Sequence, residues 1–256
     1  VADADIVPDA DELEVMFKYG LTVRQLRWRR SKIAEKKEKF PQEYPEDDIN
    51  CFLATTNTVF PVAVLQAMVR EATPPREVAG PLSRWKPAHP AHRYVIGADP
   101  AEGIKGGDPS CAQVLDAMTG EKVAILHGYI GVQDFGRRIA DVAREYNDAL
   151  IVPERNNHGH ALILTLEGLG ARNLYRHREE HGAPGRPGFP TTQASKMHLV
   201  AQLRAALEGG DVKEPDKETL RELIEFQVDA SNRYGAPEGR HDDRVMAFML
   251  AVQGRL

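Results

Sequence analysis

Acidic residues stand at the end or the beginning of apolar runs at three places in this 256-residue chain. Asp99 ends the run YVIGAD, Glu154 follows LIVP, and the pair Asp242–Asp243 precedes RVMAFMLAV. Because apolar runs fold into a core, each run should carry its acid to the edge of that core. A single carboxylate there is costly to remove from water, and several together repel one another. A shared divalent cation relieves both costs, so the pattern favours a metal-dependent phosphoryl-transfer site.

The overall composition sets few limits on the partner of such a site. The hydrophobic content of 42% and the charged content of 28% are typical of globular proteins. The formal net charge of -5 excludes a basic field over the whole chain, so any contact with DNA has to come from local patches. No apolar stretch approaches the roughly 20 residues that span a bilayer. The chain begins without Met, and we expect it to be part of a longer protein.

The first 91 residues are typical of an arm or linker rather than of a compact domain. Residues 1–20 are acidic and are expected to be irregular, and a helix is expected over 22–40 with Thr22 as its N-cap. Arg and Lys crowd that helix, which fits either a solvated face or a contact with DNA or a partner. A short helix is expected over 61–72, and the proline-rich segment 73–91 is typical of a linker or a wrapped arm.

Residues 92–256 are predicted to form one α/β domain. Three apolar segments separated by glycine-containing turns predict an antiparallel meander over 93–99, 110–118 and 122–130. The elements expected after the meander are a helix over 132–147, a strand over 149–154, a helix over 158–170, a strand over 171–177, a helix over 195–210, a helix running into a strand over 219–229, and a helix over 242–256. This order describes a mixed sheet with helices on its faces.

Phosphodiester cleavage by two metal ions explains why acids would be needed at these positions. The two ions, about 3.5–4 Å apart, share carboxylate ligands, and Mg²⁺ and Mn²⁺ prefer oxygen ligands. Asp99 and Glu154 are expected at the ends of adjacent strands, with Asp242 and Asp243 brought alongside by the last helix. Each acid also has a structural interpretation. Asp99 could form a turn before Pro100, Glu154 could pair with an Arg, and Asp242 could be a helix N-cap. Taken together, with glycine-rich turns beside two of the three clusters, they favour the metal site.

Two basic residues near the acids are further candidates. His241 precedes the acidic pair, where it could donate a hydrogen bond or carry a proton. Lys196 stands at the start of the helix after a Gly/Pro-rich segment, where it could contact a phosphate. An exposed lysine is equally ordinary at such a position.

Four motifs follow one another along the chain: GADPAEGIKGGDPS, VPERNNHG, GFPTTQASKMHLVAQLRAAL and GRHDDRVMAF. In this order they resemble the nuclease domain of the large terminase subunit of tailed bacteriophages. PERNNHG and GRHDDRVMA carry most of the resemblance. The preceding segment 21–60 resembles the connection between the ATPase and nuclease domains of that family. The resemblance implies that residues 1–91 are a remnant of this connection and that 92–256 are the nuclease domain.

The resemblance implies an RNase H-like (RuvC-like) fold, a mixed sheet flanked by helices, with an N-terminal helical linker arm. It implies a metal-dependent endonuclease that cuts concatemeric double-stranded viral DNA. Asp99, Glu154, Asp242 and Asp243 would be the catalytic, metal-binding acids, with Mg²⁺ or Mn²⁺ as cofactor and two ions expected. Either acid of the Asp242–Asp243 pair could be the principal ligand, with Asp243 favoured. Asp108, in the turn after the first strand, is an auxiliary candidate.

The resemblance also implies partners. The segment 174–192 corresponds to a hairpin near the active site of the family, and Arg178 and Arg186 are its candidates for contact with DNA, together with Lys196. Portal protein, the small terminase subunit and the ATPase domain of the same protein are expected partners, and the expected location is the host cytoplasm at the procapsid portal. The P-loop pattern G-x-x-x-x-G-K-[ST] does not occur in this sequence, so we expect no ATPase activity from it.

Three other interpretations stay open. One is a different RNase H-like nuclease, such as a Holliday-junction resolvase. Another is a sugar kinase or actin-like ATPase, which also places an Asp and a glycine turn after its first strand but needs a duplicated domain that this sequence does not show. The last is a non-catalytic module that docks on DNA or on the portal.

Overall fold

The computed structural model describes residues 7–37, 40, 44, 58–177 and 185–255. The chain divides into two compact units, Val1–Thr56 and Asn57–Leu256. The second unit begins earlier than the expected start near His92, because a helix and two strands within 58–91 pack against elements that follow them in the chain.

In the first unit, helix α1 (Ala10–Tyr19) forms where the sequence led us to expect irregular structure. The physical reason is a capping box: the Asp9 carboxylate accepts from the Glu12 backbone N–H at 2.8 Å, and Glu12 accepts from the Asp9 N–H at 2.9 Å. Helix α2 (Val23–Lys36) begins after its N-cap Thr22, as expected, and Arg30 on it pairs with Glu12 at 2.6 Å.

The second unit is built on a six-stranded sheet in the order β1-β2-β5-β4-β3-β6. The strands are β1 (Glu77–Ala79), β2 (Leu82–Arg84), β3 (Tyr94–Asp99), β4 (Ser110–Asp116), β5 (Lys122–Gly128) and β6 (Leu150–Pro153). The expected meander is observed as β3, β4 and β5, while β6 pairs with β3 in parallel. The segment 73–91, expected to be a linker or a wrapped arm, contributes two strands to the sheet. Its hairpin β1–β2 extends the sheet because β2 pairs with β5, with Leu82 opposite Leu126.

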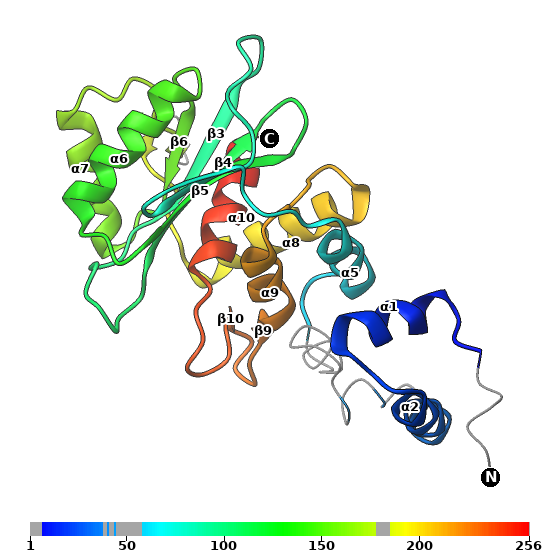
Figure 1. Ribbon diagram of the computed structural model, residues 1–256. Coiled ribbons are helices and arrows are strands. Elements are labelled where there is room, and N and C mark those ends of the chain that lie inside the picture. Colours follow the sequence, from blue (N-terminus) through cyan, green and yellow to red (C-terminus); the bar gives the residue numbers. More distant parts are fainter. Residues whose placement is uncertain (1–6, 38–39, 41–43, 45–57, 178–184, 256) are drawn as a thin grey trace. The chain divides into compact units, whose positions relative to one another are not determined.

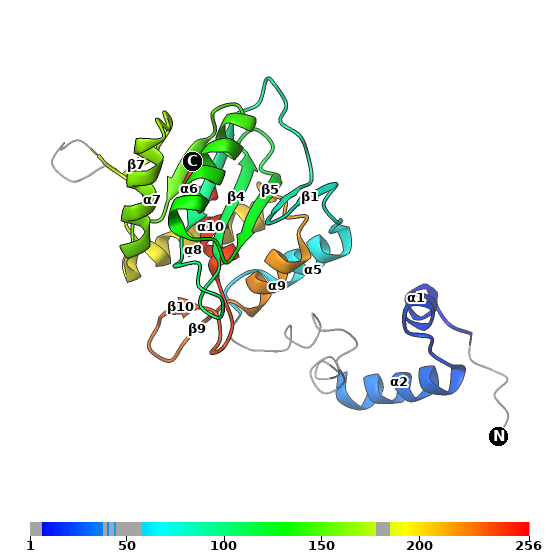
Figure 2. The same cartoon turned by 60° about the vertical axis from the view of Figure 1, so that its left-hand side comes forward.

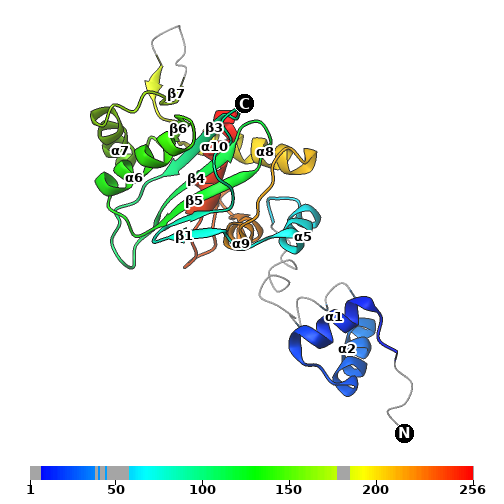
Figure 3. The same cartoon turned by 45° about the horizontal axis from the view of Figure 1, so that its top comes forward.

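Helices cover both faces of the sheet (Figures 1 and 3). One face carries α6 (Val132–Glu145) and α7 (Asn157–Gly168), whose apolar sides meet the larger core cluster. The opposite face carries α10 (Asp243–Arg255), with α8 (Gln193–Gly209) and α9 (Lys217–Glu225) outside it. Helix α5 (Val62–Glu71) lies beside α9 (Figure 2). None of the helices in the described part of the chain is long and apolar enough to cross a membrane.

Two short hairpin sheets complete the unit. One pairs β7 (Arg176–His177) with β8 (Arg186–Pro187), and the other pairs β9 (Gln227–Val228) with β10 (Tyr234–Gly235) between α9 and α10. The strand expected over 171–177 is therefore reduced to β7 and an isolated bridge between Ile151 and Leu174. The helix-to-strand transition expected over 219–229 is observed as α9 followed by β9.

The close crossing of α10 over β3 depends on Gly97. A Cβ atom at this position would stand 2.0 Å from the Ala247 carbonyl oxygen, so only glycine allows the approach. Gly254, near the other end of α10, faces Val95 at the start of β3. The helix therefore runs antiparallel to the strand, and its first residue, Asp243, comes to the end of β3 that carries Asp99.

Candidate functional site

Asp99 and Glu154 are neighbours because their strands are paired in parallel. Ala98 lies opposite Pro153, and the Glu154 N–H donates to the Ala98 carbonyl at 2.8 Å. Asn156 holds the acid in place, since its Nδ2 donates to Glu154 Oε2 at 2.6 Å. The Oδ1 of Asn156 accepts from the Gly159 N–H at 2.8 Å and thereby caps α7.

The two acids at the start of α10 have different surroundings. Asp242 is the residue before the helix, and its carbonyl accepts from the Met246 N–H at 2.8 Å. Its carboxylate pairs with Lys196 Nζ at 3.0 Å. Asp243 is the first helical residue and is buried, and its Oδ2 lies 3.0 Å from His127 Nε2. Asp242 therefore has a lysine ammonium group beside it, whereas Asp243 has an imidazole ring beside it.

These acids line one open cavity of about 710 Å³. The carboxyl side chains among its lining residues are Asp99, Glu102, Asp108, Glu154, Asp242 and Asp243, which are six in number. Two lysine or arginine side chains, Lys196 and Arg240, lie among the same described lining residues. The cavity therefore carries excess negative charge. Its volume is large enough for a phosphate group.

The crowding of carboxylates acts most strongly on Asp99. Burial raises the pKa of Asp99 well above its ordinary value of 3.8, and the adjacent Glu154, Asp242 and Asp243 raise it further. Protonation is one way to reduce this repulsion, and a bound cation is the other. The residues fit a hard divalent cation, because the carboxylates that act on one another here stand at strand ends and at a helix start and offer oxygen ligands.

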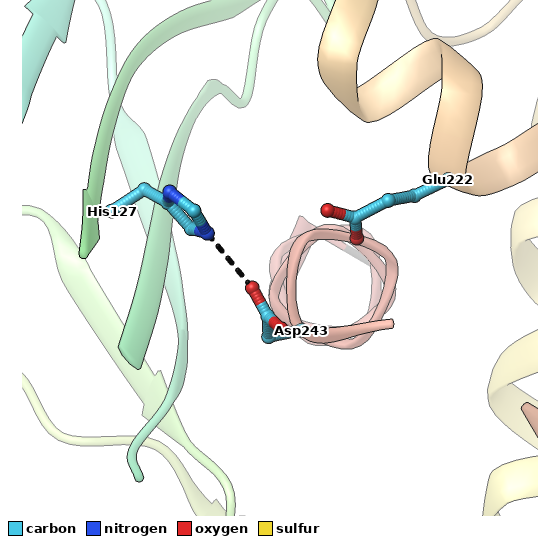
Figure 4. Close-up of side chains that lie close together, drawn as sticks. All are labelled: His127, Glu222 and Asp243. Carbon is cyan, nitrogen blue, oxygen red and sulfur yellow. Dashed lines mark hydrogen bonds and ion pairs between the residues drawn. The ribbon is translucent and has the colours of Figure 1, made fainter. Parts of the chain in front are cut away.

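Asp243 also belongs to a second group with ligand-like spacing (Figure 4). His127 from β5, Glu222 from α9 and Asp243 each offer an atom within 4.8 Å of the others. This group already contains a cation, because the Arg244 guanidinium lies 3.1 Å from His127 Nδ1 and 3.2 Å from Glu222 Oε1. Neither His127 nor Glu222 lines the cavity described above.

Glu222 adds little negative charge beside Asp243. Burial is the main cause that raises the pKa of Glu222 from 4.5 to about 9; the charge of Asp243 acts in the same direction and Arg244 in the opposite one. Because ionised Glu222 is disfavoured and Arg244 is cationic, the uncompensated carboxylates are those around Asp99 and Glu154. The cavity is therefore the better place for a divalent cation than the His127 group.

The remaining residues singled out in the sequence are spread around the cavity. His241 Nδ1 lies 3.0 Å from Asp108 Oδ1, so this histidine contacts the loop after β3 rather than the acidic pair that follows it. The Asp108 side chain is 81% exposed. Arg186 is exposed on β8, and Arg178 lies outside the described residues. Phe189, just after β8, pairs with Glu154 and brings this hairpin to the cavity.

Sequence reasoning missed His127, Glu222 and Arg244. The available signal was a histidine at the end of an otherwise apolar strand, KVAILHG, where a polar side chain needs a partner. Glu222 and Arg244 look like ordinary charged residues of amphipathic helices, and only their approach to Asp243 in space distinguishes them.

No protein-family model matches this sequence, and no curated protein matches it. The structure, in contrast, is similar to solved nuclease domains of phage large terminases. The magnesium-bound large terminase nuclease of thermophilic phage G20c is 26% identical, with a TM-score of 0.61, covering 78% of this chain and 98% of that one. The cobalt-bound form of the same nuclease gives 27% identity and a TM-score of 0.62 over the same shares.

The large terminase nuclease domain of Thermus phage P74-26 is similar as well, at 26% identity and a TM-score of 0.58, covering 73% of this chain and 93% of that one. The large terminase of bacteriophage HK97 covers 98% of this chain at 11% identity and a TM-score of 0.50, which concerns the fold alone; this chain spans 56% of it. The resemblance to terminase nucleases and the RNase H-like fold with a mixed sheet between helices are confirmed.

Proposed function

We propose that this chain is the nuclease part of a phage large terminase and that it cuts double-stranded DNA with the help of a divalent cation. The observation that supports this most directly is the cavity, where six carboxyl groups stand against two lysine or arginine side chains. A phosphodiester cannot approach so negative a site unless a cation balances it. The similar nucleases of phage G20c were solved with magnesium and with cobalt, which agrees with a divalent cation here.

Asp99, Glu154 and Asp243 are the residues that we propose hold the cation, as Mg²⁺ or Mn²⁺ and as a pair of ions. A divalent cation held there would polarise the scissile phosphate and lower the pKa of a bound water, so that hydroxide would be available as the nucleophile. The protein supplies rigid placement: β3 and β6 fix the first two acids, and α10 fixes the third. Asn156 prevents Glu154 from turning away through its 2.6 Å hydrogen bond.

The cationic side chains have a separate role in the proposal. Lys196 is partly exposed at the cavity and can exchange its contact with Asp242 for a phosphate oxygen of DNA. Arg186 extends the contact along the backbone, because the β7–β8 hairpin is anchored beside Glu154. Asp242 and Asp108 are auxiliary acids in this arrangement, and His241 orients Asp108.

The wider context follows from the family. We propose that the substrate is concatemeric viral DNA, cut at the start and end of packaging in the host cytoplasm at the procapsid portal. Portal protein, the small terminase subunit and the ATPase domain of the same protein are the proposed partners, and no ATPase activity is expected from this chain itself.

Plasmid cleavage tests the proposal. We expect the purified chain to nick or linearise plasmid in Mn²⁺ or Mg²⁺, and Asp99→Asn to abolish the activity. Asp141→Asn makes the same chemical change on the exposed side of α6, where Asp141 is 70% exposed, and should leave the rate unchanged. Cleavage that survives Asp99→Asn or excess chelator would sink the proposal.

Two further measurements separate the other interpretations. A Holliday-junction resolvase would cut a four-way junction in preference to linear duplex, and calorimetry would detect ATP binding by an actin-like ATPase. Mn²⁺ titration that shows no binding to the unmodified chain would favour a non-catalytic docking module.

A further inference from the structure

Asp243 lies within hydrogen-bond distance of a residue outside the cavity lining. His127, near the end of β5, brings its Nε2 to 3.0 Å from Asp243 Oδ2. The ring is part of a continuous polar path, because Arg244 approaches its other nitrogen at 3.1 Å. Each member of this path belongs to a helix or strand of the same compact unit.

The partner on the far side of the ring decides which nitrogen of His127 carries the proton. Arginine has only donors, so the His127 Nδ1 that faces the Arg244 guanidinium must be the acceptor. A neutral imidazole has one donor and one acceptor, and the proton is therefore on Nε2. The ring accepts from Arg244 and donates to Asp243 Oδ2.

Arg244 cannot turn away to release this constraint. Its NH1 donates to Asp216 Oδ2 at 2.8 Å, and its Nε lies 3.2 Å from Glu222 Oε1. Asp216 is fixed in turn by buried Lys122 at 3.2 Å and by the Thr219 hydroxyl at 2.8 Å. The guanidinium is thus held on two sides, by Asp216 and by Glu222.

We propose that His127 is a positioning residue, held by Arg244 as the Nε2–H tautomer, that orients Asp243 by occupying one of its two carboxylate oxygens. Oδ1 of Asp243 then remains for a cation in the cavity. His127 is not a metal ligand in this arrangement, although its spacing to Glu222 and Asp243 suits one. The inference rests on the proposed role of Asp243 as a cation ligand, but the tautomer itself does not.

The tautomer can be measured directly on the unmodified chain. Long-range ¹⁵N–¹H correlation spectra of the metal-free protein distinguish Nδ1–H from Nε2–H, and the signals of His127 are identified by their loss in His127→Gln. We expect a single Nε2–H tautomer at neutral pH. An Nδ1–H tautomer, or an averaged mixture of the two, would overturn the proposal.

Two substitutions at His127 separate positioning from simple packing. Glutamine carries a donor and an acceptor on one amide, so His127→Gln can still donate to Asp243 and accept from Arg244. Alanine can do neither. We expect His127→Ala to weaken Mn²⁺ binding by roughly 10- to 100-fold, and His127→Gln to restore most of it. His160→Ala, at an exposed position on α7, is the matched control and should bind Mn²⁺ like the unmodified chain.

The outcomes keep this inference apart from the proposed function. Equal Mn²⁺ affinity of His127→Ala and the unmodified chain would overturn positioning, whatever the nuclease does. Equal losses in His127→Ala and His127→Gln, with unchanged melting temperatures, would also overturn it. Mn²⁺ affinity could decrease from the unmodified chain through His127→Gln to His127→Ala while even the unmodified chain does not cut DNA. In that case the positioning role of His127 holds and the proposed nuclease activity fails.

Discussion

Glu154 lies directly beside Asp99, because the parallel register of β3 and β6 pairs Ala98 with Pro153 and the Glu154 N–H donates to the Ala98 carbonyl at 2.8 Å. Two acids are thus held together by backbone hydrogen bonds that do not depend on their charges. An Asn in place of either acid would remove the repulsion between the two carboxylates. Proteins commonly retain such a destabilising arrangement where the residues serve a function.

Replacing Asp99 by Asn should therefore stabilise the metal-free protein while abolishing cleavage. Removing one of the crowded carboxylates should contribute on the order of 1 kcal/mol, which corresponds to about 2–4 °C in melting temperature for a domain of this size. Thermal unfolding in chelator at pH 8 measures the first effect, and plasmid nicking in Mn²⁺ measures the second. A lower melting temperature for the variant would show that the repulsion argument is wrong.

Lys196→Ala should change metal and DNA binding in opposite directions. Lys196 neutralises Asp242 at 3.0 Å, so its loss makes the cavity more negative, and Mn²⁺ should bind somewhat more tightly. DNA should bind more weakly, and the dependence of log affinity on log salt should lose about one unit of slope. Calorimetry and fluorescence anisotropy with Ca²⁺ in place of Mn²⁺ measure the two effects.

Arg204→Ala provides the control for that experiment. Arg204 lies on the same helix α8 and pairs with Glu208 at 2.9 Å, away from the cavity lining. It should leave Mn²⁺ affinity unchanged. If both substitutions weaken DNA binding equally, Lys196 has no special contact with the substrate.

The stability of the protein should depend on pH through Glu214, which is buried against Lys122 at 2.6 Å. Burial raises the pKa of Glu214 from 4.5 to about 7, with Lys122 opposing the shift. Between pH 4.5 and about pH 7 the Glu214 carboxyl is protonated in the folded state but ionised in the unfolded state. Its contribution to the free energy of unfolding is therefore complete below about pH 4.5 and is lost as pH rises through about 7.

Glu214→Gln removes that titration. Relative to the unmodified chain, the free energy of unfolding of the variant should rise by about 1–3 kcal/mol between pH 5 and pH 8. Urea unfolding at both pH values gives the difference, whatever its absolute value at either pH. A difference that stays constant with pH would contradict the raised pKa.

Gly97→Ala should both destabilise the fold and disturb the site. The new Cβ would stand 2.0 Å from the Ala247 carbonyl oxygen, so α10 has to move away from β3. We expect a loss of about 2–4 kcal/mol, together with weaker Mn²⁺ binding because Asp243 moves with the helix.

Gly168→Ala is the matched control. Gly168 is in the last turn of α7, and a Cβ there meets nothing within 4 Å. The substitution should be neutral or stabilising by up to about 1 kcal/mol. If Gly97→Ala behaves in the same way, the close crossing of α10 over β3 does not position the acids.

Several strands and helices around the site could be predicted from short stretches of the sequence. The run YVIGAD predicts a buried strand because its residues before Asp99 are apolar, and LIVPE and the helix after Asp242 follow the same logic. The sequence also contained a helix-start signal that the prediction of irregular structure over 1–20 did not take into account. Asp9 and Glu12 are a capping-box pair, and α1 begins there. Proline content did not reveal the strands within 73–91, because β1 and β2 pair through only three residues each.

By itself, the sequence determined the strands that end at Asp99 and Glu154 and the helix that follows Asp242, because periodicity and capping act between near neighbours. Only the tertiary structure decided that Lys196 neutralises Asp242, that His241 contacts Asp108, and that His127 contacts Asp243. His127 and Asp243 are 116 positions apart in the chain. Their contact follows from the sheet order and from the crossing of α10 over β3, and side-chain hydrogen bonds of this kind exist only once those long-range packings have formed.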